Sequence, residues 1–344
     1  MNRKNFLSSI LATGAAFPLS SFIESGKKTD NRHFLIPPYL KNGDTIGIAC
    51  PAGFITPQEI QPAVQQIESW GYKIRIGDTV GKKDFTFGGT DEERRKDFQQ
   101  MLDDPFAKAI LCARGGYGAV RILDQLDFKT FVAKPKWIIG FSDITFIHNH
   151  INQNFHIASI HSKMCNSFPD DWSKAEPIQV ESILSIRKAL SGEQMKYEVA
   201  PDADNRNGIA TGILVGGNLK TIETLSATKS DMQTAGKILF VEDTGEYLYG
   251  IDRMFWNLKR TGKLDKLAGL IIGGFKIKPD DPGEEFGKTL HEIVLEKVKA
   301  FNYPLCFGFP VGHQKENYAL KLGAMHRIEV NSTAVSLKEL MPVV

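Results

Sequence analysis

The chain has 344 residues, of which 42% are hydrophobic and 24% are charged, and its formal net charge is +2. This length allows two ordinary domains, and the balanced charge argues against a nucleic-acid-binding protein or one held on an anionic membrane surface. After residue 25 no apolar run is long enough to span a bilayer, so the sequence predicts no stable membrane anchor there.

The N-terminus has the composition of an export signal. Arg3 and Lys4 precede a run of apolar and small residues that extends to Phe22, which is the order of a basic region and a hydrophobic region. The sequence RKNFL at residues 3–7 resembles a twin-arginine signal in which one Arg is replaced by Lys. The alternative is an ordinary N-terminal tail. We set residues 1–30 apart as an export signal and tail, and predict an exported, periplasmic protein.

Between residues 31 and 168, apolar runs alternate with amphipathic stretches. The runs that predict buried strands are 44–50, 72–76, 109–112 and 137–139. The stretches that predict helices are 57–70, 90–102 and 119–126. Thr90, with Glu93 three residues later, predicts a capping box at the second helix. Strands that alternate with helices predict a doubly wound parallel sheet, in which ligands lie at the carboxyl ends of the strands.

The alternation weakens between residues 169 and 207, where several prolines and a polar run interrupt it, and we predict a linker region there. After residue 207 the pattern resumes. Strands are predicted at 210–216, 237–241, 268–273, 304–309, 324–330 and 333–337, and helices at 218–226, 249–260 and 289–299. The expected architecture is α/β, with an N-terminal domain at 31–168 and a C-terminal domain at 208–344 whose mixed sheet is barrel-like.

Residues 137–145 (WIIGFSDIT) have the layout of a nucleophile elbow. A short buried strand leads into Gly140, and Ser142 stands at the start of a helix predicted near Asp143. Such a turn exposes a serine hydroxyl beside backbone N–H groups. The usual hydrolase motif has a second glycine where this chain has Ile144, so the motif is half met. The alternative is that Ser142 is an ordinary N-cap.

A glycine-rich loop, RGGYGA at residues 114–119, lies between a predicted strand and a helix. It lacks the lysine and hydroxyl residue of a P-loop and the spacing of a dinucleotide-binding motif. Nucleotide binding is therefore a weaker interpretation than a supply of backbone N–H groups for an oxyanion beside Ser142.

The histidines and cysteines give little support for a metal site. His148, His150, His156 and His161 follow Ser142, but the spacing of the first two places them on different sides of a helix, and a site built on them is a weak alternative. The four cysteines, which are Cys50, Cys112, Cys165 and Cys306, contain no C-x-x-C pair. We expect no metal and no cofactor, and free thiols rather than a disulfide.

Several separated motifs together resemble the LD-carboxypeptidases, also called muramoyltetrapeptide carboxypeptidases. They are RGGYG at 114–118, GFSDIT at 140–145, GGNL at 216–219, ILFVED at 238–243, and GH at 312–313 with Asn317. The match covers roughly residues 40–330, which makes it more specific than any single pattern. The resemblance implies a serine peptidase that removes the terminal D-amino acid, D-alanine, from murein tetrapeptides, without metal or cofactor.

The resemblance also implies catalytic roles for individual residues. Ser142 stands at the position of the family's nucleophile, His313 at that of its base and Glu242 at that of its orienting carboxylate. Glu246 is a second acid close after the same predicted strand, but it follows Gly245 in a more permissive loop. We therefore prefer Glu242, which the strand anchors directly.

Other residues are candidates for the oxyanion hole and for substrate binding. We expect the backbone N–H groups of Gly116 and Asp143 to hold the oxyanion. Arg114 and Tyr117, in the glycine-rich loop, are candidates for substrate binding, with Arg114 as the cation for a terminal carboxylate. The alternative for Arg114 is a structural ion pair with Asp143 or another acid of the loop.

This chain departs from the family pattern in two places, both expected near the substrate groove. It has His161-Ser162-Lys163 where the family commonly has His-Gly-Pro, and Lys321 where the late loop often has a proline. Two other functions remain open: a related branch of the family hydrolyses peptidyl-nucleotide antibiotics, and a murein-binding protein without turnover is the alternative outside the enzyme class. The expected partner is a murein peptide and not a nucleic acid. The sequence leaves the monomer and the homodimer both open.

Overall fold

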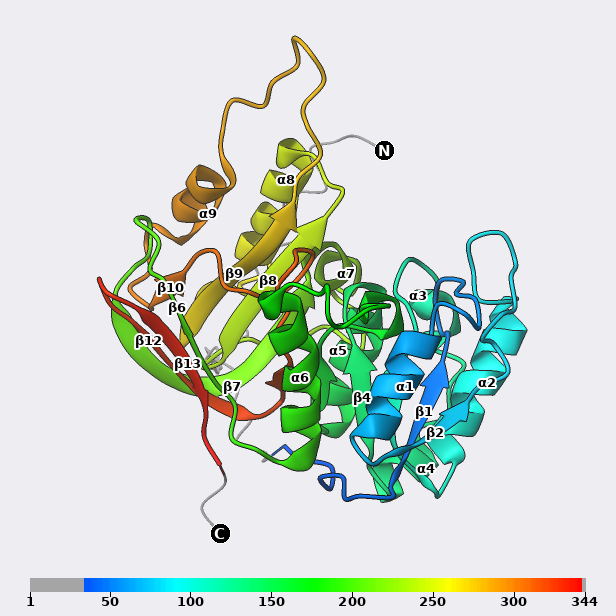
Figure 1. Ribbon diagram of the computed structural model, residues 1–344. Coiled ribbons are helices and arrows are strands. Elements are labelled where there is room, and N and C mark those ends of the chain that lie inside the picture. Colours follow the sequence, from blue (N-terminus) through cyan, green and yellow to red (C-terminus); the bar gives the residue numbers. More distant parts are fainter. Residues whose placement is uncertain (1–33, 342–344) are drawn as a thin grey trace, which may run out of the picture. The chain divides into compact units, whose positions relative to one another are not determined.

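Residues 34–341 are described by a computed structural model (Figure 1). The predicted export signal, residues 1–30, lies outside the described residues. All the described residues fall within one unit, which extends from Arg32 to Val344. No helix in residues 34–341 combines the length and the apolar character needed to cross a bilayer.

The first sheet has six strands in the order β11-β5-β4-β3-β1-β2. Their bounds are Thr45–Ala49 (β1), Lys73–Ile76 (β2), Ala107–Cys112 (β3), Trp137–Gly140 (β4), Ser159–His161 (β5) and Leu320–Leu322 (β11). Strands β1 to β5 are parallel, and β11 pairs antiparallel with β5. The chain passes from β1 to β2 on one side and then to β3, β4 and β5 on the other, which confirms the predicted doubly wound sheet.

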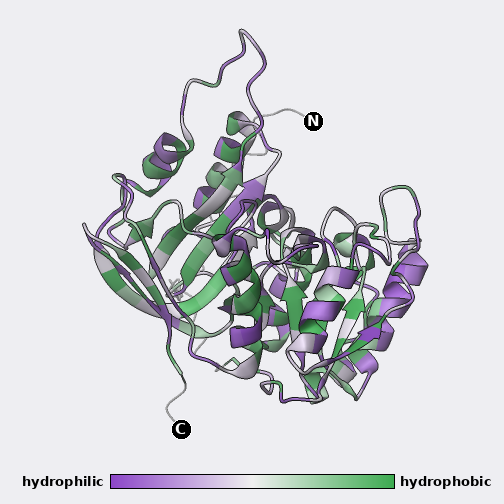
Figure 2. Ribbon diagram, in the orientation of Figure 1, coloured by the Kyte–Doolittle hydropathy of each residue, from purple (hydrophilic) through white to green (hydrophobic). Residues whose placement is uncertain are grey.

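Helices cover both faces of this sheet. They are Gln61–Ser69 (α1), Asp91–Asp103 (α2), Ala119–Leu123 (α3), Lys129–Ala133 (α4), Thr145–Phe155 (α5) and Pro177–Ser191 (α6). Along β3 the side chains alternate, so that Leu111 packs with α1 and α6 whereas Ile110 packs with α2 to α5. Figure 2 shows the strands largely hydrophobic and the outer side of α2 hydrophilic. The predicted capping box of Thr90 and Glu93 is present at α2.

The second sheet has seven strands in the order β10-β9-β8-β7-β12-β13-β6. Their bounds are Lys196–Val199 (β6), Gly208–Asn218 (β7), Ile238–Thr244 (β8), Gly269–Lys276 (β9), Leu305–Cys306 (β10), Met325–Val330 (β12) and Val335–Glu339 (β13). Strands β7 to β10 are parallel and the remaining pairs are antiparallel, so the sheet is mixed, as predicted. The expected barrel-like form is wrong, because the sheet is open. The outer edge of β10 is paired with Arg206 and not with β6, because Arg206 and Leu305 exchange backbone hydrogen bonds of 3.0 and 3.1 Å.

The second sheet is covered by helices on one face and by strand β11 on the other. The helices are Leu219–Thr224 (α7), Leu248–Arg260 (α8) and Leu290–Val298 (α9), and they share a core with the apolar side chains of β7, β8 and β9. On the opposite face, Leu320 and Leu322 of β11 pack with Phe240 and Ile271 of the second sheet. Because β11 is hydrogen bonded to β5, it belongs to both layers and joins them.

Residues 169–207, predicted as a linker region, contain α6 and β6. The prolines suggested an interruption, but Pro177 stands in the first turn of α6, where proline is favoured because its missing N–H has no partner in the helix. Ile183 and Ile186 of this helix are buried in the core of the first sheet.

Candidate active site

Ser142 lies on a strained turn at the carboxyl end of β4. The strand ends at Gly140, and Ser142 opens a short 3₁₀ helix, Ser142–Ile144, with φ +60°. A left-handed conformation is unusual for a residue other than glycine and is the conformation expected of a nucleophile elbow. Phe141, not Ser142, occupies the N-cap position of the 3₁₀ helix, so the N-cap interpretation of Ser142 is wrong. A Cβ at Gly140 would lie 2.9 Å from Ile144 Cγ1, so the turn requires a glycine there.

Glu242 and His313 are in direct contact. Glu242 is fully buried near the carboxyl end of β8, and its Oε2 lies 2.5 Å from Nδ1 of His313. Because a carboxylate accepts, Nδ1 carries the proton, and Nε2 is left as the basic nitrogen of the neutral ring. A Cβ at Gly312 would lie 2.5 Å from Glu242 Cβ, and Gly312 has φ +108°. Glycine is therefore what allows the His313 loop to approach the carboxylate.

The serine turn and the histidine loop come from different sheets, and two contacts join the segment around Ser142 to the second sheet and its histidine loop. The ring of Phe141, next to Ser142, lies 4.9 Å from the ring of His313 between centroids. Oγ1 of Thr145, at the start of α5, accepts the N–H of Asn218 at the end of β7, at 3.1 Å. The structure thus places Ser142, Glu242 and His313 on elements that touch one another.

The glycine-rich loop packs against the serine. A Cβ at Gly115 would lie 3.1 Å from Cβ and 3.3 Å from Oγ of Ser142, so the backbone of the loop can approach this closely only without a side chain. Gly116, the next residue, has φ +100°. The carboxylate of Asp143 is turned to the N-terminus of α3, where Oδ2 accepts the N–H of Ala119 at 2.7 Å. Burial raises the pKa of Asp143 to about 6.

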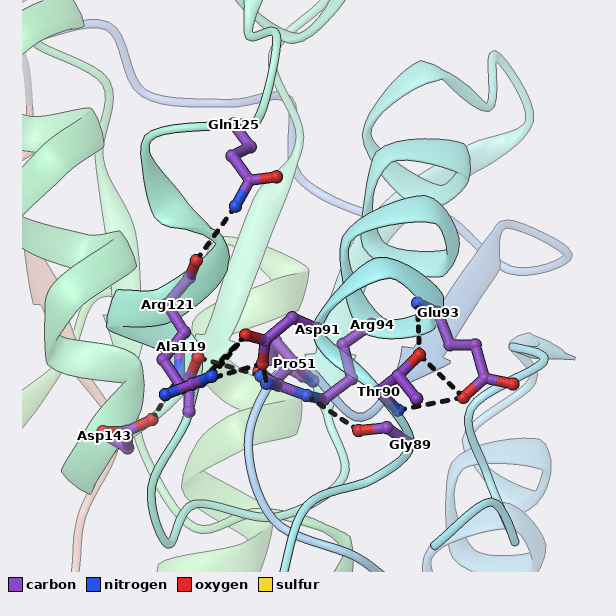
Figure 3. Close-up of polar contacts among 11 residues, drawn as sticks. Pro51, Gly89, Thr90, Asp91, Glu93, Arg94, Ala119, Arg121, Gln125 and Asp143 are labelled. Carbon is purple, nitrogen blue, oxygen red and sulfur yellow. Dashed lines mark hydrogen bonds and ion pairs between the residues drawn. The ribbon is translucent and has the colours of Figure 1, made fainter. Parts of the chain in front are cut away.

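A buried arginine holds the glycine-rich loop in place (Figure 3). Arg94 of α2 is fully buried, and its Nη1 donates to the carbonyls of Pro51, at 2.7 Å, and Gly118, at 2.8 Å. Its Nε donates to Gly89, at 3.2 Å, and its Nη2 pairs with Asp91. The guanidinium therefore fixes three loop segments beside the serine turn. Sequence reasoning missed Arg94, because in a highly charged helix one buried cation gives no separate signal.

Comparison with known proteins decides the family. Models of the LD-carboxypeptidase N-terminal domain and the LD-carboxypeptidase C-terminal domain match residues 46–162 and 211–328. The chain belongs to the LD-carboxypeptidase family. The proposed nucleophile lies in the first matched region, the acid Glu242 lies in the second, and His313 lies near the end of the second.

Relatives of known sequence or structure match most of this chain. The "Probable murein peptide carboxypeptidase" of Bacillus subtilis (strain 168) is 31% identical over 290 residues, which are 84% of this chain and 89% of the relative. The crystal structure of a muramoyltetrapeptide carboxypeptidase from Oxalobacter formigenes superposes with a TM-score of 0.76 at 26% identity, covering 86% of this chain and 98% of that one. The microcin C7 self-immunity protein MccF of Escherichia coli is 25% identical over 335 residues, 89% of this chain and 96% of its own.

Two other acids lie close to Glu242 along the chain, Asp243 within β8 and Glu246 in the loop that follows it. Asp243 accepts Asn218 Nδ2 at 3.0 Å and the N–H of Lys220 at 2.9 Å, so its carboxylate is turned to the N-terminus of α7. Burial raises its pKa to about 6. Glu246 is partly buried in the loop after β8. Glu242 is therefore the acid of this segment that contacts the imidazole.

The histidine loop is held by a buried asparagine, Asn317. Oδ1 of Asn317 accepts the N–H of Gly312 at 2.8 Å and lies 3.0 Å from Nε2 of His161. A backbone N–H can only donate, so the amide oxygen is identified, and Nε2 of His161 must carry a proton. Burial lowers the pKa of His161 well below its usual range. His148 similarly donates from Nε2 to the carbonyl of Gly140, at 2.9 Å, beneath the serine turn.

The predicted substrate-binding residues lie at the rim of the loop. Arg114 is exposed, and its Nη1 donates to the carbonyl of Phe54 at 3.1 Å. The alternative of an ion pair with Asp143 is not seen among the described residues. Tyr117 is 54% exposed, and its ring lies 5.9 Å from that of Phe87 between centroids. Both side chains are exposed, so their role in substrate binding stays a prediction.

The two departures from the family pattern have different surroundings. Lys163 follows β5 and donates to the carbonyl of Gln314, next to His313, at 2.8 Å. Lys321, in contrast, is buried in β11, and its Nζ contacts the two carboxylate oxygens of Glu339 at 3.1 and 3.0 Å. It also lies over the ring of Tyr39. Lys321 is thus part of the core between β11 and β13.

The described residues contain one group of side chains that could hold a metal ion. Atoms of Asp202, Asp204 and His291 lie within 4.8 Å of one another, but Nδ1 of His291 is already hydrogen bonded to Asp204 Oδ2 at 2.7 Å. The four cysteines are buried and free, as predicted. Burial raises the pKa of Cys50 and of Cys306 to about 12, which disfavours the thiolate form of both.

Proposed function

We propose that this chain is a serine LD-carboxypeptidase that removes the terminal D-amino acid, D-alanine, from murein tetrapeptides. The observation that carries the proposal is the buried contact of Glu242 Oε2 with His313 Nδ1, 2.5 Å long, next to the strained turn of Ser142. A hydroxyl nucleophile needs a base whose tautomer is fixed by a carboxylate, and these residues have the chemistry and the order for it.

The proposed reaction is an acyl transfer to Ser142. Its Oγ attacks the scissile carbonyl carbon while Nε2 of His313 takes the hydroxyl proton. The negative charge that forms on the carbonyl oxygen is held by the N–H groups of Gly116 and Asp143. As the C–N bond breaks, His313 returns the proton to the leaving amine, and Glu242 stabilises the imidazolium in between. Water, activated by the same histidine, then hydrolyses the ester and regenerates the serine.

We also propose that the protein is exported to the periplasm, on the basis of the N-terminal order of basic and apolar residues. Murein peptides would meet the enzyme there. Fractionation of cells that express the full chain tests this directly. A chain found only in the cytosol, with residues 1–30 retained, would contradict it.

Hydrolysis of a peptidyl-nucleotide is the second candidate function. The similarity to MccF, whose name describes immunity to microcin C7, supports it. Both candidates use the same nucleophile and base, so they differ in the leaving group that the site accepts. Release of a nucleotide-bearing fragment from a peptidyl-nucleotide, with no D-alanine released from a tetrapeptide, would favour this candidate over the first.

The test is incubation of the protein with a purified murein tetrapeptide, followed by mass spectrometry. The parent protein is expected to release one D-alanine from each tetrapeptide, and a Ser142→Ala variant is expected to release none in the same time. A fluorophosphonate probe provides a check that is independent of the substrate, because it labels activated serines. A protein that binds the tetrapeptide without turnover and without labelling would be the non-catalytic alternative.

A further inference from the structure

Lys163 is a partly buried cation with unused hydrogen-bonding capacity at the edge of the site. An ammonium group has three N–H donors, and one of these donates to the carbonyl of Gln314 at 2.8 Å. Within residues 34–341 no carboxylate oxygen lies within 4.0 Å of its Nζ, although the charge of Glu316 acts on it from a greater distance. Burial lowers the pKa of Lys163, so an anion that pairs with it would relieve an unfavourable environment.

The position of Lys163 in the fold places it beside the reacting groups. It follows β5, at the carboxyl ends of the parallel strands, where Ser142 also lies. The next residue, Met164, approaches the same glycine as the serine does, since its Cε would lie 3.2 Å from a Cβ at Gly115. The ammonium itself is bound to Gln314, the residue after His313. Lys163 therefore contacts the histidine loop, while its neighbour Met164 packs at the glycine that approaches Ser142.

The chemistry of the leaving group determines which side of the site needs a cation. His313 must hand a proton to the amine that leaves, so the terminal amino acid has to lie on the side of His313. Its carboxylate carbon is two bonds from that nitrogen, a distance of about 2.5 Å. A cation that recognises the carboxylate must therefore lie close to the His313 loop. The guanidinium of Arg114, in contrast, is hydrogen bonded to Phe54, in the segment that packs on Gly115.

We propose that Lys163 binds the terminal carboxylate of the substrate on the leaving-group side, which makes this chain selective for peptides with a free carboxyl end. The inference rests on the proposed carboxypeptidase function and deepens it. At this position the family commonly has proline, which carries no charge, so the recognition would be a property of this chain. Arg114 is then left to contact parts of the peptide farther from the leaving group.

The test compares Lys163→Met with Lys163→Arg and Arg114→Ala on two peptides that differ only at the carboxyl end, one a free acid and the other an amide. Loss of a charge-assisted hydrogen bond should raise KM for the acid roughly 10- to 100-fold in Lys163→Met. KM for the amide should change by less than about twofold, since no charge is recognised there. Lys163→Arg keeps the charge, so its KM for the acid should lie between the values of the parent and of Lys163→Met. Arg114→Ala should change KM for the two peptides by similar factors.

The fluorophosphonate reaction separates binding from positioning. The probe has no carboxylate, so its rate of labelling Ser142 should be the same in Lys163→Met and in the parent if the His313 loop stays in place. A loss of acid and amide turnover in equal proportion, or a selective loss in Arg114→Ala instead, would overturn the inference while leaving the proposed function intact. A parent protein that cleaves neither peptide would overturn both.

Discussion

Replacing Glu242 by glutamine tests the assignment of the orienting acid most directly. The contact that changes is the buried one between its Oε2 and His313 Nδ1, at 2.5 Å. A hydrogen bond to a charged group contributes about 1.5–3 kcal/mol, which corresponds to roughly 10- to 100-fold in rate at 1.36 kcal/mol per factor of ten. The second carboxylate oxygen, Oε1, is buried without a hydrogen-bond partner among the described residues. Nothing there holds the amide of a glutamine in one orientation.

The rate of the Glu242→Gln variant therefore falls further whenever the amide nitrogen of the glutamine faces His313. In that orientation an N–H meets Nδ1, the ring proton moves to Nε2, and the base for Ser142 is lost. Together the two effects should lower kcat by on the order of 10² to 10⁴. Steady-state kinetics on one tetrapeptide measures this, with Glu246→Gln as the matched control, expected to lose less than about tenfold. A larger loss in Glu246→Gln, or a Glu242→Gln variant within tenfold of the parent, would refute the assignment.

Three further predictions concern the nucleophile, the buried arginine and the pH dependence of stability. Ser142→Ala should lower kcat by on the order of 10³ or more with an unchanged melting temperature, and D-alanine release near the parent rate would show that another group is the nucleophile. Arg94→Met leaves three carbonyls without their donor and should lower the free energy of unfolding, measured in urea, by about 3 kcal/mol or more. The control Arg95→Met removes an ion pair with Glu92 and should change that free energy by less than about 0.5 kcal/mol. Similar losses of stability in the two variants would contradict this prediction. The unfolding free energy should also fall as the pH is lowered from about 6.5 to about 4, because burial lowers the pKa of several histidines to about 4 and only the unfolded chain takes up protons there. These histidines are His148, His150 and His326. The buried carboxyls of Asp143 and Asp243, with pKa raised to about 6, act in the opposite direction but are fewer. Thermal unfolding at pH 7 and pH 5 checks the sign, and a higher melting temperature at pH 5 would contradict it.

Features with a strong local signal were predictable from the sequence. The apolar runs that became β4 and β8 are buried along their length, and such runs between turn residues predict strands. The capping boxes of α2 and α9 satisfy backbone donors with side chains three residues away, so they too are local. The pairing of Glu242 with His313 came only through the resemblance, because residues separated by so much chain have no local pattern that joins them.

Features that depend on long-range contacts were not predictable. Strand β11 has three residues, too few for a periodic signal, and it exists because β5 offers a free edge. The outer edge of β10 is paired with Arg206, and the apolar run at 304–309 carries no sign of this partner. The burial of Arg94 depends on the carbonyls of Pro51 and Gly118, which lie 43 and 24 residues away along the chain. In each case the deciding partner lies far along the chain.

The pairing of β11 with β5 also determines when the sheet that carries Ser142 can be completed. Residues 320–322 hydrogen bond to residues 159–161, so during synthesis the edge of β5 remains unpaired until residue 322 has left the ribosome. An exposed strand edge is a template for association with other chains, and non-local pairing of this kind slows folding. A fragment that ends before residue 320 would keep its serine and still lack the strand that covers this edge. Expressed alone, it should associate through β5 and not fold into an independent half.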